Sequence, residues 1–417
     1  MPPFQRTSRR ASAGRRGYNR SHGCGMSLRK LTRSAARVVY GADAVEELSG
    51  ELDRLSIARP LLLCGRTMNR DAATISRVRA AAGRSLTVAP LVRAHSPVDS
   101  IHAVVEVMDR ESIDGILALG GGSAIVSARA ASILRAERKP VEQLITRRVG
   151  DLWSSPRLTE PKLPVVALPT VPTTAIATAG TALTRPGLDD RLVMFDPKAR
   201  AAAILVDPDL LGTAPVDVVT SAVRNALAMA VEGLLSLAAS PFSDALLAHA
   251  ARVCLHLFSD GAERSESHRV ELALAAVMVG EGAELADVGV TAALSHVIGH
   301  RFGVANGDVD ALLLPVVLRF HIDHGFPVDA RLRRVGLPSA DALGDLLDRS
   351  WSSTSVGGLR GCGVALEHTA SIAAAALRDY ASSRSPVPAT VDDLTRILLS
   401  ALKPGRIRSV DSGEAPV

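Results

Sequence analysis

Short apolar runs alternate with longer amphipathic segments over the first half of the chain. Six runs have the composition of strands: residues 37–40, 60–65, 86–91, 115–119, 165–168 and 203–206. Three segments between them have the spaced apolar positions of helices: residues 44–55, 71–84 and 98–110. Apolar strands that alternate with helices are typical of a parallel sheet with right-handed crossovers. The sequence therefore predicts an α/β domain in this half.

The pattern changes after Asp207-Pro208. Residues 216–300 form long Ala- and Leu-rich stretches with few helix breakers, and prolines punctuate further helical segments toward the end of the chain. We therefore expect an all-α second domain. The expected boundaries are 31–210 for the α/β domain and 211–405 for the helical domain, with tails at 1–30 and 406–417.

The net charge of +5 is distributed unevenly along the 417 residues. Residues 1–30 hold eight Arg and Lys and no Asp or Glu, so the other 387 residues carry a net charge of −3. We interpret the basic segment as a disordered leader, or as sequence that precedes a start at Met26. Contact of this segment with nucleic acid or anionic lipid is the less favoured interpretation. With only 3% aromatic residues, the chain is not expected to bind nucleic acid.

Cysteine usage and the longest uncharged run bear on the location of the protein. The four cysteines are widely spaced and form no CxxC pair, which fits a reducing cytoplasm without a structural zinc site. The uncharged run at 163–184 spans 22 residues but contains three prolines, so it is not expected to cross a membrane. We expect a cytoplasmic protein with no membrane partner.

A glycine-rich segment follows the apolar run 115–119. Gly120, Gly121, Gly122 and Ser123 lead directly into an Ala-rich helix. Glycines allow the backbone N–H groups at a helix start to approach a phosphate, although a tight strand–helix turn gives the same pattern. The segment is therefore a candidate pyrophosphate site.

Two further segments are candidates for cofactor contact. The hydroxyls of Thr170 and Thr174 lie in a proline-containing loop, where they suit a ribose or phosphate as well as a helix cap. Gly65 and Arg66 follow the run 60–65, where a dinucleotide-binding fold often has a carboxylate for the ribose 2′-hydroxyl of NAD. A guanidinium there favours NADP over NAD, with a solvated surface arginine as the alternative.

His296 and His300 are four residues apart in a segment with helical spacing. They therefore share one helix face. This spacing can bind a metal, but no HExxH motif is present. A structural role or a single catalytic histidine is favoured over a paired metal site.

Several short motifs follow one another in a distinctive order along the chain. They are Arg37-Val-Val-Tyr-Gly41, Gly120-Gly-Gly-Ser123, Leu168-Pro-Thr170, Val206-Asp-Pro208, Asn225-Ala-Leu-Ala-Met229-Ala-Val-Glu232, His296-Val-Ile-Gly299, Asn306-Gly307 and Ala311-Leu-Leu-Leu-Pro315. In this order the chain resembles the iron-containing alcohol dehydrogenase superfamily over nearly all of residues 35–402. The resemblance implies an N-terminal dinucleotide-binding domain, a helical C-terminal domain and hydride transfer in the cleft between them.

The metal ligands of that superfamily do not carry over. Its members hold iron or zinc with one Asp and three His, and the matching positions here are Asn225, Met229, Ala292 and Asn306. None of these side chains is a carboxylate or an imidazole, so we expect no metal site. Asn225 and Asn306 are instead expected to hydrogen-bond the hydroxyl or carbonyl of the substrate.

The resemblance also implies roles for three basic residues. His296 matches the superfamily histidine near the nicotinamide, and we expect it to be the general acid/base, with His300 as the second candidate. Arg191 matches a lysine on the cofactor side of the superfamily. Arg129 matches another lysine, near the glycine segment, and its phosphate-binding geometry is open.

The expected function is an NAD(P)-dependent, metal-independent oxidoreductase that interconverts an alcohol and a carbonyl, with NADP slightly favoured over NAD. The 43 Arg against five Lys fit a GC-rich bacterial genome, where specialised metabolism is one setting. By analogy alone, the substrate is a peptide whose C-terminal threonine is oxidised and decarboxylated, as in daptide-type biosynthesis. The expected partners are a small molecule or a peptide and, because the superfamily favours dimers and larger assemblies, further copies of the chain.

Two alternatives remain open at this stage. Asn at the position of the metal-binding Asp also occurs in maleylacetate reductases, but those enzymes keep histidines that this chain lacks at 229, 292 and 306. A scaffold protein that has lost catalysis is the other alternative. A retained glycine segment and His296 argue against it, and cofactor binding distinguishes the two.

Overall fold

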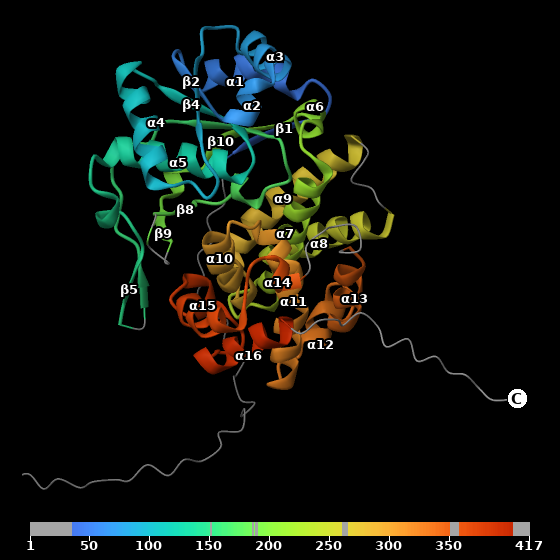
Figure 1. The fold of residues 1–417 in the computed structure, drawn as a ribbon. Helices are drawn as coiled ribbons and strands as arrows, with labels where there is room; N and C mark the ends of the chain where they lie inside the picture. The colour runs from blue at the N-terminus through green and yellow to red at the C-terminus, as the bar shows by residue number, and fades with distance from the viewer. Residues whose placement is uncertain are drawn as a thin grey trace, which may run out of the picture. The chain divides into compact units, whose positions relative to one another are not determined.

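The computed structural model describes residues 36–150, 152–185, 187, 191–260, 266–350 and 358–402. The predicted tails at 1–30 and 406–417 lie outside these residues. Within them, the first half of the chain contains a parallel sheet and the second half is helical (Figure 1). The predicted fold class, an α/β domain followed by helices, is confirmed.

Six strands form the main sheet. In spatial order they are β1 (Arg37–Tyr40), β10 (Ala201–Val206), β7 (Val165–Pro169), β4 (Gly115–Gly120), β2 (Pro60–Gly65) and β3 (Thr87–Val92). Every pairing between neighbours is parallel. Each strand coincides with one of the six apolar runs to within two residues, because strands buried on both faces need apolar side chains at successive positions.

Different helices bury the two faces of the sheet. On one face, Leu62 and Leu117 pack with α1 (Leu48–Arg54) and α3 (Ala72–Ala82). Successive side chains of a strand point to opposite faces, so Leu61 and Ile116 pack with the helices of the other face. Those helices are α4 (Val98–Arg110) and α5 (Gly122–Glu137). Helices therefore cover both faces, as Figure 1 shows.

The helical half builds two further cores. Its longer helices are α7 (Val216–Leu235), α8 (Pro241–Asp260), α9 (Glu266–Ala286), α10 (Val290–Phe302), α11 (Asn306–Asp323), α13 (Ala340–Ser350) and α16 (Val391–Ala401). Shorter helices are α6 (Pro208–Gly212), α12 (Val328–Arg334), α14 (Gly358–Gly361) and α15 (Thr369–Ala376). By length and composition α7 passes a test for a membrane span, but 72% of its most apolar window is buried in the protein, as in a core helix.

Some elements differ from the sequence prediction. The segment 44–55 is a 3₁₀ turn, η1 (Ala44–Glu47), followed by α1, and not one continuous helix. A short helix, α2 (Arg66–Arg70), follows β2. Two antiparallel hairpins, β5 (Arg147–Val149) with β6 (Leu152–Ser154) and β8 (Gly180–Leu183) with β9 (Leu192–Phe195), were not predicted, because strands this short carry little periodic signal.

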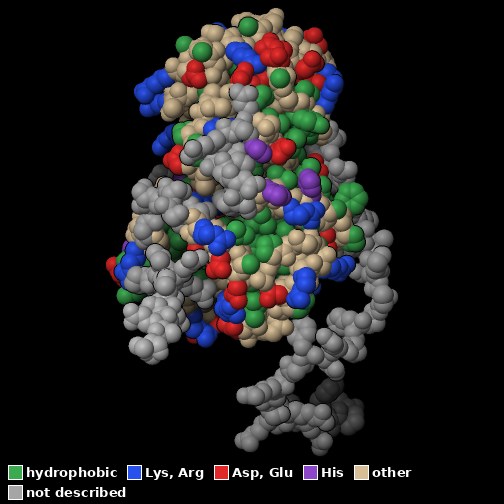
Figure 2. All heavy atoms as spheres, turned by 90° about the vertical axis from the view of Figure 1, so that its right-hand side faces the viewer, with side chains coloured by type: hydrophobic (Ala, Val, Ile, Leu, Met, Phe, Trp, Pro, Cys, Tyr) green, Lys and Arg blue, Asp and Glu red, His purple; other side chains and the backbone are tan. Residues whose placement is uncertain are grey.

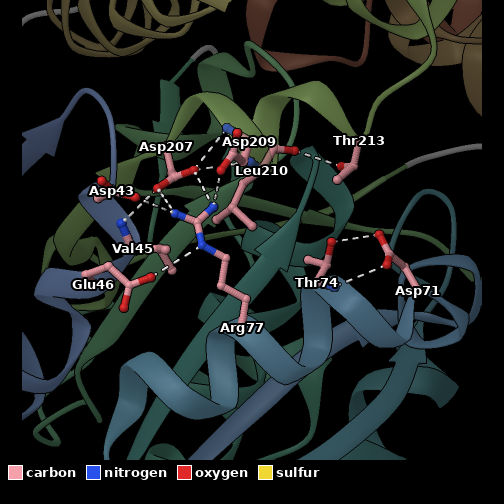
Figure 3. Close-up of polar contacts among 10 residues, drawn as sticks. All are labelled: Asp43, Val45, Glu46, Asp71, Thr74, Arg77, Asp207, Asp209, Leu210 and Thr213. Atoms are coloured by element: carbon pink, nitrogen blue, oxygen red, sulfur yellow. Dashed lines mark hydrogen bonds and ion pairs between the residues drawn. The ribbon is translucent and has the colours of Figure 1, made fainter.

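Asp207 joins the end of the sheet to the helices around it (Figure 3). Its buried carboxylate accepts hydrogen bonds from three backbone N–H groups, those of Val45, Asp209 and Leu210. Two nitrogens of the Arg77 guanidinium lie 3.1 and 3.2 Å from the two oxygens of the same carboxylate. Arg77 forms ion pairs with three more carboxylates: Asp43, Glu46 and Asp209. The Val206-Asp-Pro208 motif therefore has a structural role.

Basic and acidic side chains are interspersed on the face drawn in Figure 2. No single large patch of either sign dominates the described residues of that face. The basic residues of segment 1–30, which account for the positive net charge, lie outside the described residues.

Candidate active site

The glycine segment lies between the end of β4 and the start of α5. Gly121 is the N-cap of α5, and no side chain caps the helix. A Cβ atom built on Gly121 would lie 3.0 Å from Val171, and one on Gly122 would lie 3.0 Å from the Thr173 hydroxyl. Close packing against the loop after β7 therefore leaves little room for a side chain at either position. The first N–H groups of a 16-residue helix are left for an anion, with the helix dipole in its favour.

Gly65 and Arg66 lie at the same edge of the sheet as the glycine segment. β2 pairs with β4 along the sheet, so the carboxyl ends of the two strands are adjacent. Arg66 begins α2 and is exposed. Its position beside the candidate phosphate site is compatible with a 2′-phosphate, and its role in cofactor choice stays a prediction.

A strained turn connects the glycine segment to the rest of the site. His95 and Ser96 both have positive φ, 59° and 49°, in the left-handed region that non-glycine residues seldom adopt. The Ser96 hydroxyl donates to the backbone carbonyl of Ser123 at 3.2 Å, and the Thr184 hydroxyl donates to that of His95 at 3.1 Å. The turn therefore holds His95 between the start of α5 and the end of β8.

His296 pairs with Asp379, a residue that the sequence did not single out. His296 Nδ1 lies 3.0 Å from Asp379 Oδ2, across 83 positions of the chain. Burial and the charge of Arg191 lower the pKa of His296, while Asp379 acts in the opposite direction. Burial alone would raise the pKa of Asp379, but its interactions with His296 and Arg191 lower it. This carboxylate therefore orients the imidazole and is kept ionised.

The helix that carries His296 is held by a buried glutamate. Glu232 of α7 accepts hydrogen bonds from three backbone N–H groups at the start of α10: those of Gly289 (3.0 Å), Thr291 (2.7 Å) and Ala292 (3.2 Å). A carboxylate at this position satisfies otherwise unpaired donors and complements the helix dipole. Glu232 thus fixes α10 and, through it, the position of His296.

Two of the four positions that match metal ligands, Asn225 and Met229, belong to a different network. The Thr174 hydroxyl lies 3.4 Å from Asn225 Oδ1 and 3.3 Å from Met229 Sδ, and Asn225 Nδ2 donates to Asp310 Oδ2 at 2.7 Å. Amides, a thioether and the methyl of Ala292 do not provide the donors that Fe²⁺ or Zn²⁺ require, so these residues do not fit a metal. Among the described residues, no cluster of three or more His, Cys, Asp or Glu has a metal-binding arrangement.

Asn306 lies on α11, four residues before Asp310. Within the part of the chain that the structure describes, Asn306 Oδ1 and Asp310 Oδ1 are buried and accept no hydrogen bond. A Cβ atom on Gly299 would lie 2.3 Å from Asn306 Oδ1, and one on Gly307 would lie 1.7 Å from the Ser221 carbonyl. Both glycines are therefore required by close packing of α10 and α7 against α11, and this packing sets the buried Asn306 Oδ1 against Gly299, three residues after His296 on α10.

Three residues predicted to contact phosphate or cofactor have partners within the protein. Arg129 is fully buried and donates to the carbonyls of Ala175, Thr178 and Gly180, at 2.5, 2.5 and 2.8 Å. Its interpretation as a possible phosphate ligand is wrong, because its donors stabilise the loop 175–180. Thr174 faces Asn225 and Met229 as described above, and the Thr170 backbone N–H donates to Gly120. Contact of these two threonines with a cofactor remains a prediction.

Asp310 gives the site a pH dependence that can be measured. Burial raises the pKa of Asp310 to about 8, despite hydrogen bonds from Ser295 and Asn225 that lower it. The folded protein therefore keeps this proton between about pH 4 and pH 8, whereas an unfolded Asp releases it near pH 4. Stability from this group is complete below about pH 4 and is lost as the pH rises through 8.

We therefore expect Asp310→Asn to be more stable than the wild type near pH 8 and to lose less stability between pH 5 and pH 8. The measurement is the free energy of unfolding from denaturant titrations at both pH values. Asp99→Asn, at an exposed ion pair with Arg93, serves as the control and should retain the wild-type slope. The same slope in Asp310→Asn would show that Asp310 is ionised at neutral pH.

Comparisons with known proteins show the family of the chain. Residues 35–208 match the family model "Iron-containing alcohol dehydrogenase", and residues 219–402 match its C-terminal model. The NAD-dependent methanol dehydrogenase of Bacillus methanolicus is 23% identical over 87% of this chain and 97% of that enzyme. The 4-hydroxybutyrate dehydrogenase of Cupriavidus necator is 28% identical over 85% and 95%. The crystal structure of a 1,3-propanediol oxidoreductase has a TM-score of 0.80 and 22% identity, and covers 89% of this chain and all of that chain.

The protein therefore belongs to the iron-containing alcohol dehydrogenase family. It is a dehydrogenase or reductase that acts on alcohols, and the related methanol dehydrogenase is NAD-dependent. The family typically binds iron, and the residues at the ligand positions of this member do not fit that metal.

Proposed function

We propose that this protein interconverts an alcohol and a carbonyl without a metal ion, and that His296 exchanges the proton with the substrate. The observation that carries the proposal is the pair formed by His296 Nδ1 and Asp379 Oδ2 at 3.0 Å. A carboxylate on Nδ1 holds the imidazole in one orientation and leaves Nε2 for proton exchange. In alcohol oxidation His296 accepts the hydroxyl proton, and in carbonyl reduction it donates one.

The glycine segment would hold the pyrophosphate of the cofactor. The backbone N–H groups of Gly122 and Ser123 face it at the start of α5, and Arg66 supplies a cation on the adjacent strand end. The nicotinamide cofactor, when bound, supplies hydride transfer to or from the substrate carbon. We infer a preference for NADP, because Arg66 stands where NAD-specific folds often have a carboxylate.

Neutral side chains would take the place of the family metal beside the substrate oxygen. Asn306 has an acceptor oxygen without a partner among the described residues, whereas the amide of Asn225 is engaged with Asp310. Of the two asparagines, Asn306 is therefore better placed to accept the hydrogen bond of a substrate hydroxyl. His300, one turn after His296, remains the second candidate for proton exchange.

A hydroxy acid that decarboxylates after oxidation suits such a site. A β-keto acid loses CO₂ without help from a metal, so the C-terminal threonine of a peptide in bacterial specialised metabolism is one substrate that fits. This choice rests on analogy and on the chemistry of the product, and no residue of the site specifies it.

A single series of measurements tests the proposal. The protein is dialysed against a chelator, its metal content is determined, and NADPH and then NADH are titrated by fluorescence. A panel of aldehydes and ketones is assayed by loss of absorbance at 340 nm. We expect tight NADPH binding, and turnover that is unchanged after chelation and unchanged by added Fe²⁺ or Zn²⁺.

Two variants define the cofactor site in the same series. Gly122→Asp adds a negative charge at the start of α5 and should weaken binding of both cofactors by at least about tenfold. Arg66→Gln should weaken NADPH binding by about tenfold and leave NADH binding unchanged. Activity that disappears on chelation and returns with Fe²⁺ or Zn²⁺ would overturn metal independence, and no binding of either cofactor would favour a scaffold role.

A further inference from the structure

Arg191 lies at the reacting end of the site. It directly precedes β9, and the pairing of Leu183 with Leu192 places Arg191 opposite Thr184 at the end of the β8–β9 hairpin. Thr184 forms an isolated bridge to Pro97 and donates to the carbonyl of His95. The register of this hairpin therefore sets Arg191 beside His95, in the turn that contacts the start of α5.

The guanidinium of Arg191 has no direct partner in the described part of the chain. Arg191 forms no hydrogen bond or ion pair with any residue in the described ranges, although most of its side chain is withdrawn from solvent. The ionisable groups around it are His95, His296 and Asp379, with His300 next to His95. Asp379 is committed elsewhere: Oδ2 pairs with His296, and Oδ1 accepts from the Ala381 N–H at 2.9 Å. The N–H groups of this half-buried guanidinium are therefore left for a bound anion, which they can hold through charge-assisted hydrogen bonds.

We propose that Arg191 binds a carboxylate of the substrate, so that the protein acts on hydroxy acids and oxo acids of short reach. The proposal rests on the function proposed above. A guanidinium offers two parallel N–H groups to a carboxylate and so fixes its orientation as well as its charge. The charge of Arg191 is felt by both Asp379 and His296, which pair at 3.0 Å, so a substrate carboxylate on Arg191 would direct the carbinol carbon toward His296.

The cofactor does not explain this cation. Its pyrophosphate is expected at Gly121–Ser123, and its nicotinamide ring is positively charged in the oxidised state. A second positive charge beside that ring raises the energy of the oxidised complex unless an anion lies between them. A substrate carboxylate supplies that anion.

The test compares two substrates that differ in one carboxylate, 4-oxobutanoate and butanal, with NADPH. The wild type should have a kcat/KM at least about tenfold higher for 4-oxobutanoate. Arg191→Gln should lower this value by about 10²-fold, with much smaller effects on butanal turnover and on the Kd of NADPH. Arg191→Lys should recover part of the loss. Arg185→Gln, at a cation of the same hairpin that is paired with Glu142, is the matched control.

The proposal is overturned by a wild type that does not favour 4-oxobutanoate. It is also overturned by an Arg191→Gln variant in which the Kd of NADPH rises and kcat/KM falls equally for both aldehydes. The second result assigns Arg191 to the cofactor, as the family resemblance predicts. If NADPH binds but neither aldehyde reacts, succinate is titrated into the enzyme–NADPH complex by calorimetry. Binding that Arg191→Gln abolishes supports the carboxylate site, and no binding by the wild type overturns it. Failure to bind NADPH at all contradicts the proposed function itself.

Discussion

Replacing His296 with Gln is expected to lower kcat by about 10²–10⁴-fold in both reaction directions, with little change in the Kd of NADPH. Gln is close to His in size and polarity but cannot exchange a proton at neutral pH. The substrate would then have to exchange its proton with water in a site where no metal ligand set stabilises an alkoxide. The measurement is steady-state turnover, with cofactor affinity determined separately by fluorescence.

Asp379→Asn provides the second arm of this prediction. Loss of the carboxylate removes the interaction that raises the pKa of His296, while burial and Arg191 continue to lower it. The pH profile of kcat/KM should therefore shift to lower pH: oxidation, which needs neutral His296, should extend to more acidic pH. Reduction, which needs protonated His296, should be confined to more acidic pH. A residue with a merely structural role would lower activity without moving the profile.

His102→Gln is the control, because His102 is an exposed histidine of α4 outside the site. It should behave as the wild type. Unchanged turnover in His296→Gln would remove His296 from the mechanism and transfer the proton role to His300, for which His300→Gln is the corresponding test.

The largest effect on stability is expected from Arg77→Met. Asp207 is fully buried, and Arg77 contacts both of its oxygens (Figure 3). Removal of the guanidinium leaves a buried carboxylate without its cation and loosens the junction of β10, α3 and η1. Breaking a buried pair in this way costs about 3–5 kcal/mol, and we expect about 3 kcal/mol because 24% of the Arg77 side chain is exposed.

The measurement is the free energy of unfolding from urea titration, followed by far-UV circular dichroism. Arg110→Met is the control, since Arg110 forms an exposed ion pair with its neighbour Glu111 and should cost less than about 1 kcal/mol. The double variant Arg77→Met/Asp207→Asn should recover part of the loss, because the neutral amide no longer needs a cation. Equal effects of Arg77→Met and Arg110→Met would show that solvent screens the Asp207 pair.

The sheet was largely predictable from the sequence. Strands such as β2 and β4 are buried on both faces, and burial demands a continuous apolar run that ends where the chain leaves the core. The hairpins β5–β6 and β8–β9 were not predictable in the same way. They are short and antiparallel, and their pairing depends on contacts with the rest of the fold.

The residues of the candidate site also differ in how far the sequence predicts them. The glycine segment, His296 and the four altered ligand positions are visible as local motifs or through the family resemblance. Asp379 and His95 are not, because neither stands in a motif. Asp379 reaches His296 from 83 residues away, and His95 is brought to the site by a strained turn that Thr184 holds.

By itself, the sequence determined the fold class and the family, and it showed that the four ligand positions lack the usual carboxylate and imidazole groups. These properties depend on which side chains occur and in what order. Only the tertiary structure decided which groups meet. It paired His296 with Asp379, committed Arg129 to a loop, gave Asp207 a structural role and left Arg191 half-buried, with no hydrogen bond or ion pair among the described residues. The physical reason is that burial and pairing depend on distances between elements far apart in the chain, and local patterns do not encode those distances.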